Sequence, residues 1–201
     1  YPEHTGTGRF GKWLENLQDW NLSRSRFWGI PLPIWRTEDG EEEVIIGSVQ
    51  ELSDAIDKAV EAGLMADNPY KVNGDLKDID LHKPYIDRVV LVSQSGKAMH
   101  REPDLIDVWF DSGSMPAAQL HYPFENKEKF LTHFPADFIS EGVDQTRGWF
   151  FTLHAIATMS FDKVAFKNVI STGLVLDKNG EKMSKRKGNV VDPFITIDKY
   201  G

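Results

Sequence analysis

Four cations lie within six positions near the carboxyl end of the chain, in the segment 182–187 with the sequence Lys-Met-Ser-Lys-Arg-Lys. The segment follows an Asn179-Gly180 pair, which favours a tight turn with positive φ. Lysines on such a loop can reach over a polyphosphate and neutralise the charge that develops as a phosphate bond breaks. A solvated basic loop is the alternative, because runs of charge are commonly exposed to water. The residues alone leave both interpretations open.

A second polar group, Ser-Glu-Gly-Val-Asp-Gln at 140–145, follows a short apolar run. Gly142 would let the backbone approach a ligand closely. Glu141, Asp144 and Gln145 could accept hydrogen bonds from an ammonium group or a ribose hydroxyl. The alternative is structural, with Asp144 as a helix cap and Glu141 solvated.

Two tryptophans are placed where they could wall an apolar pocket. Trp109 lies in the segment 107–114, Asp-Val-Trp-Phe-Asp-Ser-Gly-Ser, which we interpret as a rim loop followed by a flexible Gly-Ser turn. Trp149 lies on a predicted helix. An ordinary core position is the alternative for both.

Arg24, Arg26 and Trp28 could contact RNA phosphates or stack on bases. We favour a structural role, in which the tryptophan packs against a sheet and the arginines lie on the surface. The six histidines are scattered without a metal-binding spacing, and the chain has no cysteine. We therefore predict no zinc held by the protein, no disulfide and no covalent nucleophile.

The composition limits the class of protein. The 201 residues include 40% hydrophobic and 27% charged side chains, which is typical of a soluble globular protein. A net charge of -8 argues against general nucleic-acid binding, so an RNA contact would need a local basic patch. No apolar run has the length of a membrane span, and there is no signal peptide. We expect a cytoplasmic protein with no DNA or membrane partner, cut from a longer chain.

The first half of the chain predicts a small α+β insertion over 38–100. Its expected elements are a strand at 44–46, a helix from a capping box at Ser48 and Glu51 to a stop at Gly63, and a strand at 87–93 that turns at Ser95-Gly96 into 98–100.

The second half predicts a different order of elements. Its expected elements are a strand at 136–140, a helix from Trp149, a strand at 164–175 and a helix capped by Asp192-Pro193. This order predicts a parallel α/β sheet, in which ligands bind beyond the carboxyl ends of the strands.

Several of these segments together resemble the class I aminoacyl-tRNA synthetases. Residues 182–186 are similar to the KMSKS signature, with Arg186 in place of the final serine. Residues 24–35 are similar to the stretch that re-enters the catalytic domain after the editing insertion of the isoleucine, valine and leucine enzymes. Residues 107–116 and 141–150 are similar to the isoleucine-specific enzymes. The valine enzymes usually carry threonine before the tryptophan, where this chain has valine.

The resemblance implies an α/β fold, namely the C-terminal half of a Rossmann-like nucleotide-binding catalytic domain. The implied domains are a re-entry segment at 1–37, an insertion like a connective peptide at 38–100, and the second half of the nucleotide-binding fold at 101–201. The roles that the resemblance implies are adenylate binding by Glu141, Gly142, Asp144 and Gln145, walls for the isoleucine side chain from Trp109 and Trp149, and contacts with the ATP phosphates from Lys182, Met183, Ser184 and Lys185, the two lysines being catalytic.

The implied reaction is two-step, ATP-dependent ligation of isoleucine to tRNA(Ile), with ATP as substrate and Mg²⁺ bound with it. A valyl- or leucyl-tRNA synthetase, or a paralogue that only binds tRNA, is the alternative. The family's His-x-Gly-His signature is absent from the sequence, so we expect this chain to be inactive alone. We further expect exposed apolar surface to cause self-association, whereas the full enzyme would be a monomer.

Overall fold

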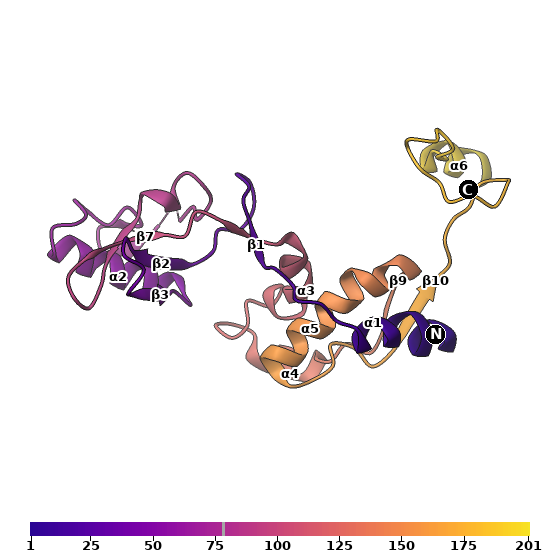
Figure 1. Cartoon of the computed structure of the whole chain (residues 1–201), viewed down its shortest axis with the longest axis horizontal. Helices are drawn as coiled ribbons and strands as arrows, with labels where there is room; N and C mark the ends of the chain where they lie inside the picture. Colours follow the sequence, from indigo (N-terminus) through magenta and orange to yellow (C-terminus); the bar gives the residue numbers. More distant parts are fainter. Residues whose placement is uncertain (78) are drawn as a thin grey trace. The chain divides into compact units, whose positions relative to one another are not determined.

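Helices and strands are distributed over two units in the computed structural model (Figure 1), which describes residues 1–77 and 79–201. The central unit is Asp19–Ser112, and the terminal unit combines Tyr1–Gln18 with Gly113–Gly201. The predicted insertion lies within the central unit. The lysine segment and the residues around Glu141 belong to the terminal unit.

The central unit is built on a four-stranded antiparallel sheet of order β3-β2-β7-β6, with a helix packed on it. Its elements are β1 (Ser23–Arg24), β2 (Ile34–Thr37), β3 (Glu43–Ile45), α2 (Val49–Glu61), β4 (Lys71–Val72), β5 (Asp75–Leu76), η2 (Ile86–Arg88), β6 (Val90–Val92), β7 (Ala98–Arg101) and β8 (Leu105–Ile106). Trp35 on β2 pairs with Val44 of β3 and Arg101 of β7. The separate β1 pairs with β8.

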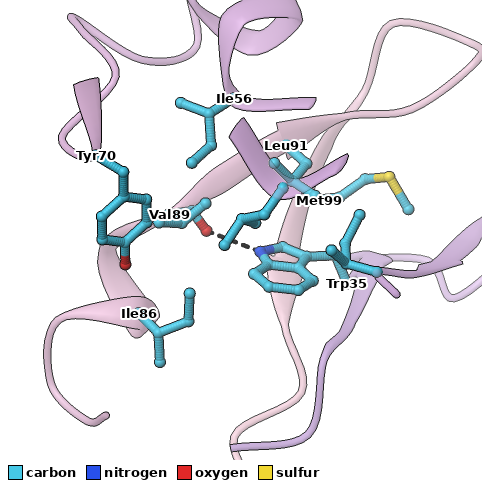
Figure 2. Packing of buried hydrophobic residues seen from close by; sticks show 9 residues of the cluster. Trp35, Ile56, Tyr70, Ile86, Val89, Leu91 and Met99 are labelled. Carbon is cyan, nitrogen blue, oxygen red and sulfur yellow. Dashed lines mark hydrogen bonds between the residues drawn. The ribbon is translucent and has the colours of Figure 1, made fainter. Parts of the chain in front are cut away.

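Trp35 lies at the centre of the core of the central unit (Figure 2) and is 1% exposed. Its indole N–H donates to the carbonyl oxygen of Val89 at 3.0 Å, so the polar edge of the ring is satisfied inside the core. Ile56 of α2, Leu91 of β6 and Met99 of β7 are buried in the same cluster. The helix and the sheet are therefore joined by one apolar core.

The predicted helix of the insertion is confirmed, including its ends. The Ser48 side chain accepts from the N–H of Glu51 at 3.0 Å. The Glu51 carboxylate accepts in return from the N–H of Gly47 at 2.7 Å, one residue before the N-cap. Gly63, at φ +75°, follows the last turn, as expected for a glycine stop.

The strand predicted at 87–93 is wrong at its start. Residues Ile86–Arg88 form a 3₁₀ turn, and β6 begins only at Val90. The reason is tertiary: the Asp87 carboxylate binds Arg101, whose side chain is 1% exposed. A turn presents Asp87 to this buried guanidinium.

The terminal unit holds a parallel strand pair with α5 between the strands in sequence. Its elements are η1 (Thr5–Phe10, a π-helix), α1 (Gly11–Glu15), α4 (Lys127–His133), β9 (Ile139–Gly142), η3 (Val143–Arg147), α5 (Trp149–Phe161), β10 (Val169–Thr172) and α6 (Pro193–Tyr200), while α3 (Val108–Ala118) begins in the central unit. β9 pairs with β10 from Ile139 opposite Val169 to Gly142 opposite Thr172. This parallel pairing is the one predicted from the strand-helix-strand order.

The strands themselves are shorter than predicted. The strand expected at 136–140 is β9, which begins at Ile139, and the strand expected at 164–175 is confined to Val169–Thr172. Before them, an isolated parallel bridge pairs Ala136 with Phe166. Between this bridge and Ile139, the side chain of Asn168 donates to the Asp137 carbonyl at 2.9 Å, and the pairing is not continuous. The predicted helix from Trp149 is confirmed. So is the Asp192-Pro193 start, where the Asp192 carboxylate accepts from the N–H of Phe194 at 2.8 Å.

The interpretation of 107–114 as a rim loop with a flexible Gly-Ser turn is wrong. The segment from Val108 onward is the helix α3. A Cβ on Gly113 would lie 2.7 Å from Ile156 Cδ1 and 2.9 Å from the backbone oxygen of Thr152. Glycine is therefore needed here for close packing of α3 against α5, and no turn is required.

Candidate functional site

The carboxyl ends of β9 and β10 lie side by side and form the rim of the candidate site. Glu141 is opposite Ser171, and Gly142 is opposite Thr172. Glu141 is exposed. The hydroxyl oxygen of Ser171 is buried and has no hydrogen-bond partner among the residues that the structure describes. The sequence analysis missed Ser171, whose only signal is its place near the end of a predicted strand.

A short turn connects this rim to α5 and fixes the start of the helix. The Gln145 side chain donates to Asp144 Oδ2 at 3.2 Å, and its oxygen accepts from the N–H of Trp149 at 3.0 Å. Gln145, not Asp144, therefore satisfies the first turn of α5, which overturns the alternative of Asp144 as the cap. A Cβ on Gly142 would lie 2.7 Å from Asp144 Oδ1, so only glycine lets this carboxylate approach the rim backbone.

Trp149 forms one wall of an apolar cavity of about 100 Å³ in the terminal unit. The other walls come from α3, α4, β9, α5 and the segment before β10. They include Met115, Pro116, Phe130, Phe134, Ile139, Leu153 and Ala165. A cavity of this size and lining can take a small aliphatic or aromatic group, since apolar cavities of comparable volume bind such molecules.

Behind the turn, a buried threonine links the rim to the amino-terminal helix. Thr146 is 1% exposed. Its hydroxyl donates to the Val143 carbonyl at 2.8 Å and accepts from Arg9 Nε at 2.9 Å. Arg147 lies over the ring of Trp13, 5.3 Å from its centroid. These contacts tie the turn to the amino-terminal segment of the same unit.

The lysines lie on a hairpin, here called the lysine hairpin (176–189), in the chain that follows β10. The turn predicted at Asn179-Gly180 is confirmed, with Gly180 at φ +78°. A bridge between Leu176 and Lys182 closes the hairpin. The Asp177 carboxylate caps the turn, since one of its oxygens accepts from the N–H groups of Asn179 and Glu181, each at 2.9 Å.

Asn189 ties the end of the lysine hairpin to its beginning. Its amide nitrogen donates to Asp177 Oδ2 at 2.8 Å, and its amide oxygen accepts from the N–H of Ser184 at 2.8 Å. The hydrogen bond from Asn189, followed by that from the Glu181 backbone, holds the pKa of Asp177 below its ordinary value. Asp177 and Asn189 together fix the backbone on both sides of the lysines; the sequence analysis missed both.

The cations of the lysine hairpin differ in whether they form an ion pair. Lys187 Nζ pairs with Glu181 at 2.9 Å. Lys182, Lys185 and Arg186 are exposed, and within the described part of the chain none of them has an ion pair. The hairpin therefore presents uncompensated positive charge, which is the arrangement that a polyphosphate ligand requires.

Trp109 lies in the central unit, apart in sequence from the rim. It is the second residue of α3 and is 41% exposed. Two residues after Trp109, burial of Asp111 raises the pKa of its carboxyl group, and the charge of Asp107 adds to this shift. Among the described residues, no group of three or more side chains is arranged to hold a metal ion.

The structural roles predicted for the arginines and for Trp28 can be compared with their observed contacts. Arg26 is exposed, as expected for a surface arginine, but Arg24 is partly buried and binds the buried carboxylate of Asp107 at 2.5 Å, so the surface position predicted for Arg24 is wrong. Trp28 does not pack against a sheet: it is 74% exposed and stacks on His82, with the ring planes 3° apart.

A model of the tRNA synthetases class I (I, L, M and V) matches residues 1–201. The chain belongs to this family. Among class I synthetases named isoleucine–tRNA ligase, the Bacteroides fragilis protein is 68% identical over all of this chain, and the Cytophaga hutchinsonii protein is 70% identical over all of it. The chain spans only 18% and 17% of the lengths of these two relatives.

A solved class I structure supports the fold. The crystal structure of the Agrobacterium radiobacter LeuRS–tRNA–LeuAMS ternary complex matches with a TM-score of 0.59 at 21% identity, covering 92% of this chain and 23% of that one. Together with the family match, it confirms the predicted α/β fold of the Rossmann-like class I catalytic domain. No helix in the described ranges is both long and apolar enough to cross a membrane.

Proposed function

We propose that the chain is part of an isoleucine–tRNA ligase, an enzyme that activates isoleucine with ATP and transfers it to tRNA(Ile) in the cytoplasm. One observation carries the proposal: relatives that are 68% and 70% identical over the whole chain bear that name. The exposed cations of the lysine hairpin supply the charge that such a reaction needs.

In the first step, a carboxylate oxygen of isoleucine attacks the α-phosphorus of ATP, the bond to the β-phosphate oxygen breaks, and pyrophosphate leaves with the electron pair. We assign Lys185 and Lys182 to the charge that develops on the leaving pyrophosphate, with Met183 and Ser184 as the backbone between them. Cations that engage mainly in the transition state raise kcat more than they tighten ground-state binding.

The rim residues are assigned to the aminoacyl-adenylate. Glu141 and Asp144 are acceptors for its ammonium group or ribose hydroxyls. Gly142 lets the backbone approach, and Gln145 holds the N–H of Trp149. Both Trp149 and Trp109 are assigned to the isoleucine side chain. In the second step, the terminal ribose hydroxyl of the tRNA attacks the carbonyl carbon, and AMP leaves.

Mg²⁺ enters this proposal as part of the ATP substrate. The carboxylates of the lysine hairpin do not fit as its ligands, because Asp177 accepts three hydrogen bonds and Glu181 pairs with Lys187. ATP-bound Mg²⁺ commonly keeps most of its ligands as water and phosphate oxygens. No step is therefore assigned to a metal held by this chain.

The test uses a chimeric ligase, in which this chain replaces the matching stretch of the Bacteroides fragilis relative. We expect isoleucine-dependent exchange of pyrophosphate into ATP, and transfer of isoleucine to tRNA(Ile). A preference for valine or leucine would instead identify the chain as part of a valyl- or leucyl-tRNA synthetase. A folded chimera that binds tRNA but shows no amino-acid-dependent exchange would refute it. The chain alone should give no exchange.

A further inference from the structure

One buried carboxylate of the central unit lies outside the functions assigned so far. Asp107 follows β8 and directly precedes α3, and it is 4% exposed. The antiparallel pairing of β1 with β8 places Arg24 opposite Leu105. The N–H of Asp107 extends this pairing by donating to the Leu22 carbonyl at 2.8 Å. The carboxylate is thereby held between the 20–24 segment and the start of α3.

The two oxygens of Asp107 face different parts of the chain. Oδ2 accepts from Arg24 Nη2 at 2.5 Å and from Trp20 Nε1 at 2.8 Å. Oδ1 accepts from the N–H of Trp109 at 3.2 Å, the second residue of α3. This is the N-cap pattern, in which a side-chain oxygen satisfies a free donor of the first helical turn. One carboxylate thus joins the 20–24 segment to the backbone of Trp109.

Only a side chain that accepts hydrogen bonds with both of its terminal atoms fits position 107. All three partners donate, and an ionised carboxylate has two acceptor oxygens and no donor. An asparagine would have the same shape but would turn its NH₂ group toward either Trp109 or the Arg24–Trp20 pair. Either orientation sets a donor against a donor, which leaves at least one buried hydrogen bond unmade.

We propose that Asp107 is a positioning residue that sets the place of the Trp109 indole and thereby the affinity for the amino-acid side chain. The inference rests on the proposed function, which assigns Trp109 to isoleucine. Asp107 itself is buried and acts through the first turn of α3. When Oδ1 no longer accepts from the Trp109 N–H, that turn loses its cap, and the backbone that carries the indole is no longer held in place. A misplaced contact residue weakens substrate binding without touching the reacting atoms.

The effect of Asp107 can be separated from a loss of folding. Arg24 Nη1 also donates to the carbonyl oxygens of Asn21 at 2.6 Å and Ser23 at 2.7 Å. The guanidinium therefore keeps acceptors when the carboxylate is changed. Asp87 offers a control, because it binds Arg101 at 2.5 Å in the same unit and, within the described part of the chain, forms no hydrogen bond with Trp109.

The experiment compares Asp107→Asn with Asp87→Asn in the chimeric ligase by isoleucine-dependent pyrophosphate exchange. In Asp107→Asn we expect the KM for isoleucine to rise on the order of tenfold, while kcat and the KM for ATP change less than twofold. Asp87→Asn should leave the KM for isoleucine within twofold. An unchanged KM for isoleucine in Asp107→Asn, or an equal rise in both variants, would overturn the inference.

A second variant covers a failure of Asp107→Asn to fold. Asp107→Glu keeps two acceptor oxygens and the charge but shifts them by one methylene, so we expect a smaller rise in the same KM. If that KM does not change, the inference fails. An unsubstituted chimera that folds but shows no isoleucine-dependent exchange refutes the proposed function itself, which is a different result from an active chimera whose KM is insensitive to Asp107.

Discussion

The core of the central unit and the lysine hairpin hold their shapes by different means. Trp35 packs with eight other buried hydrophobic residues from the helix, the sheet and the intervening loops. The lysine hairpin has no buried residue between 176 and 189 and relies on hydrogen bonds centred on Asp177 and Asn189. Apolar burial makes a region stable whatever it binds, whereas a solvated hairpin keeps its charges available. The first region should fail by unfolding and the second by losing activity.

The largest effect is expected from a cavity in the core of the central unit. Ile56 is 0% exposed, so Ile56→Ala should lower the free energy of unfolding by about 2–5 kcal/mol. Ile45 is 62% exposed, and Ile45→Ala, the control, should change it by only about 0.5 kcal/mol. Chemical denaturation of the chain followed by circular dichroism measures both. Equal losses in the two variants would contradict the assignment of the core.

The next effect concerns catalysis alone. Lys185→Ala in the chimeric ligase should lower pyrophosphate exchange by about 10²–10³-fold, the usual cost of removing one group that stabilises transition-state charge. The thermal midpoint should not move, because Lys185 is exposed and forms no ion pair within the described residues. Lys187→Ala is the matched control: Lys187 pairs with Glu181, so its loss should cost less than tenfold. A larger effect at Lys187 would reverse the roles assigned to the two lysines.

A smaller effect is expected from the hydrogen bonds of the hairpin. Asn189→Asp removes the donor to Asp177 and sets two carboxylates against each other, so exchange should fall by roughly tenfold, a change of about 1.4 kcal/mol. The control is Asn179→Asp, which adds the same charge to the hairpin without removing a side-chain contact that the structure shows. If both variants lose activity equally, then charge and not the Asn189 contact is responsible.

The smallest effect is a pH dependence confined to the hairpin. The pKa of Asp177 lies below its ordinary value of 3.8 because Asn189 and backbone N–H groups bind the charged form. The stabilising contribution is therefore complete above that value and is lost as the pH falls through the lower pKa of the folded state. The protection of the Glu181 and Asn179 amides, which is their exchange rate measured by NMR relative to the intrinsic rate at the same pH, should fall only below about pH 4. A fall in protection near pH 6 would point to a different group.

The sequence predicted those elements whose signals are local. The Ser48 cap, the Gly63 stop, the Asn179-Gly180 turn and the Asp192-Pro193 start all depend on residues within one turn of each other. The helix starting at Trp149 was predictable because its apolar residues repeat with the helical period. The exposed positive charge of the lysine hairpin was predictable for the same reason, since its four cations lie within six positions.

What the sequence could not provide depends on distant partners. Gly113 looked like a turn residue, because its need to pack against Thr152 is invisible without the fold. Asp87 looked like part of a strand until its buried partner, Arg101, was known. α4 has a single buried residue, Phe130, which is too weak a pattern to predict a helix. The roles of Asp107 and Asn189 likewise depend on contacts that no short-range pattern encodes.

The close packing of α3 against α5 at Gly113 also determines the width of the apolar cavity beside Trp149. Gly113 does not line the apolar cavity beside Trp149, although Met115 and Pro116 on the same helix do. An alanine here would act as a wedge, because the backbone of Thr152 cannot yield, and the helix would be lifted from α5 along with those two walls. The width of the apolar cavity therefore depends on Gly113, a residue that does not line the cavity.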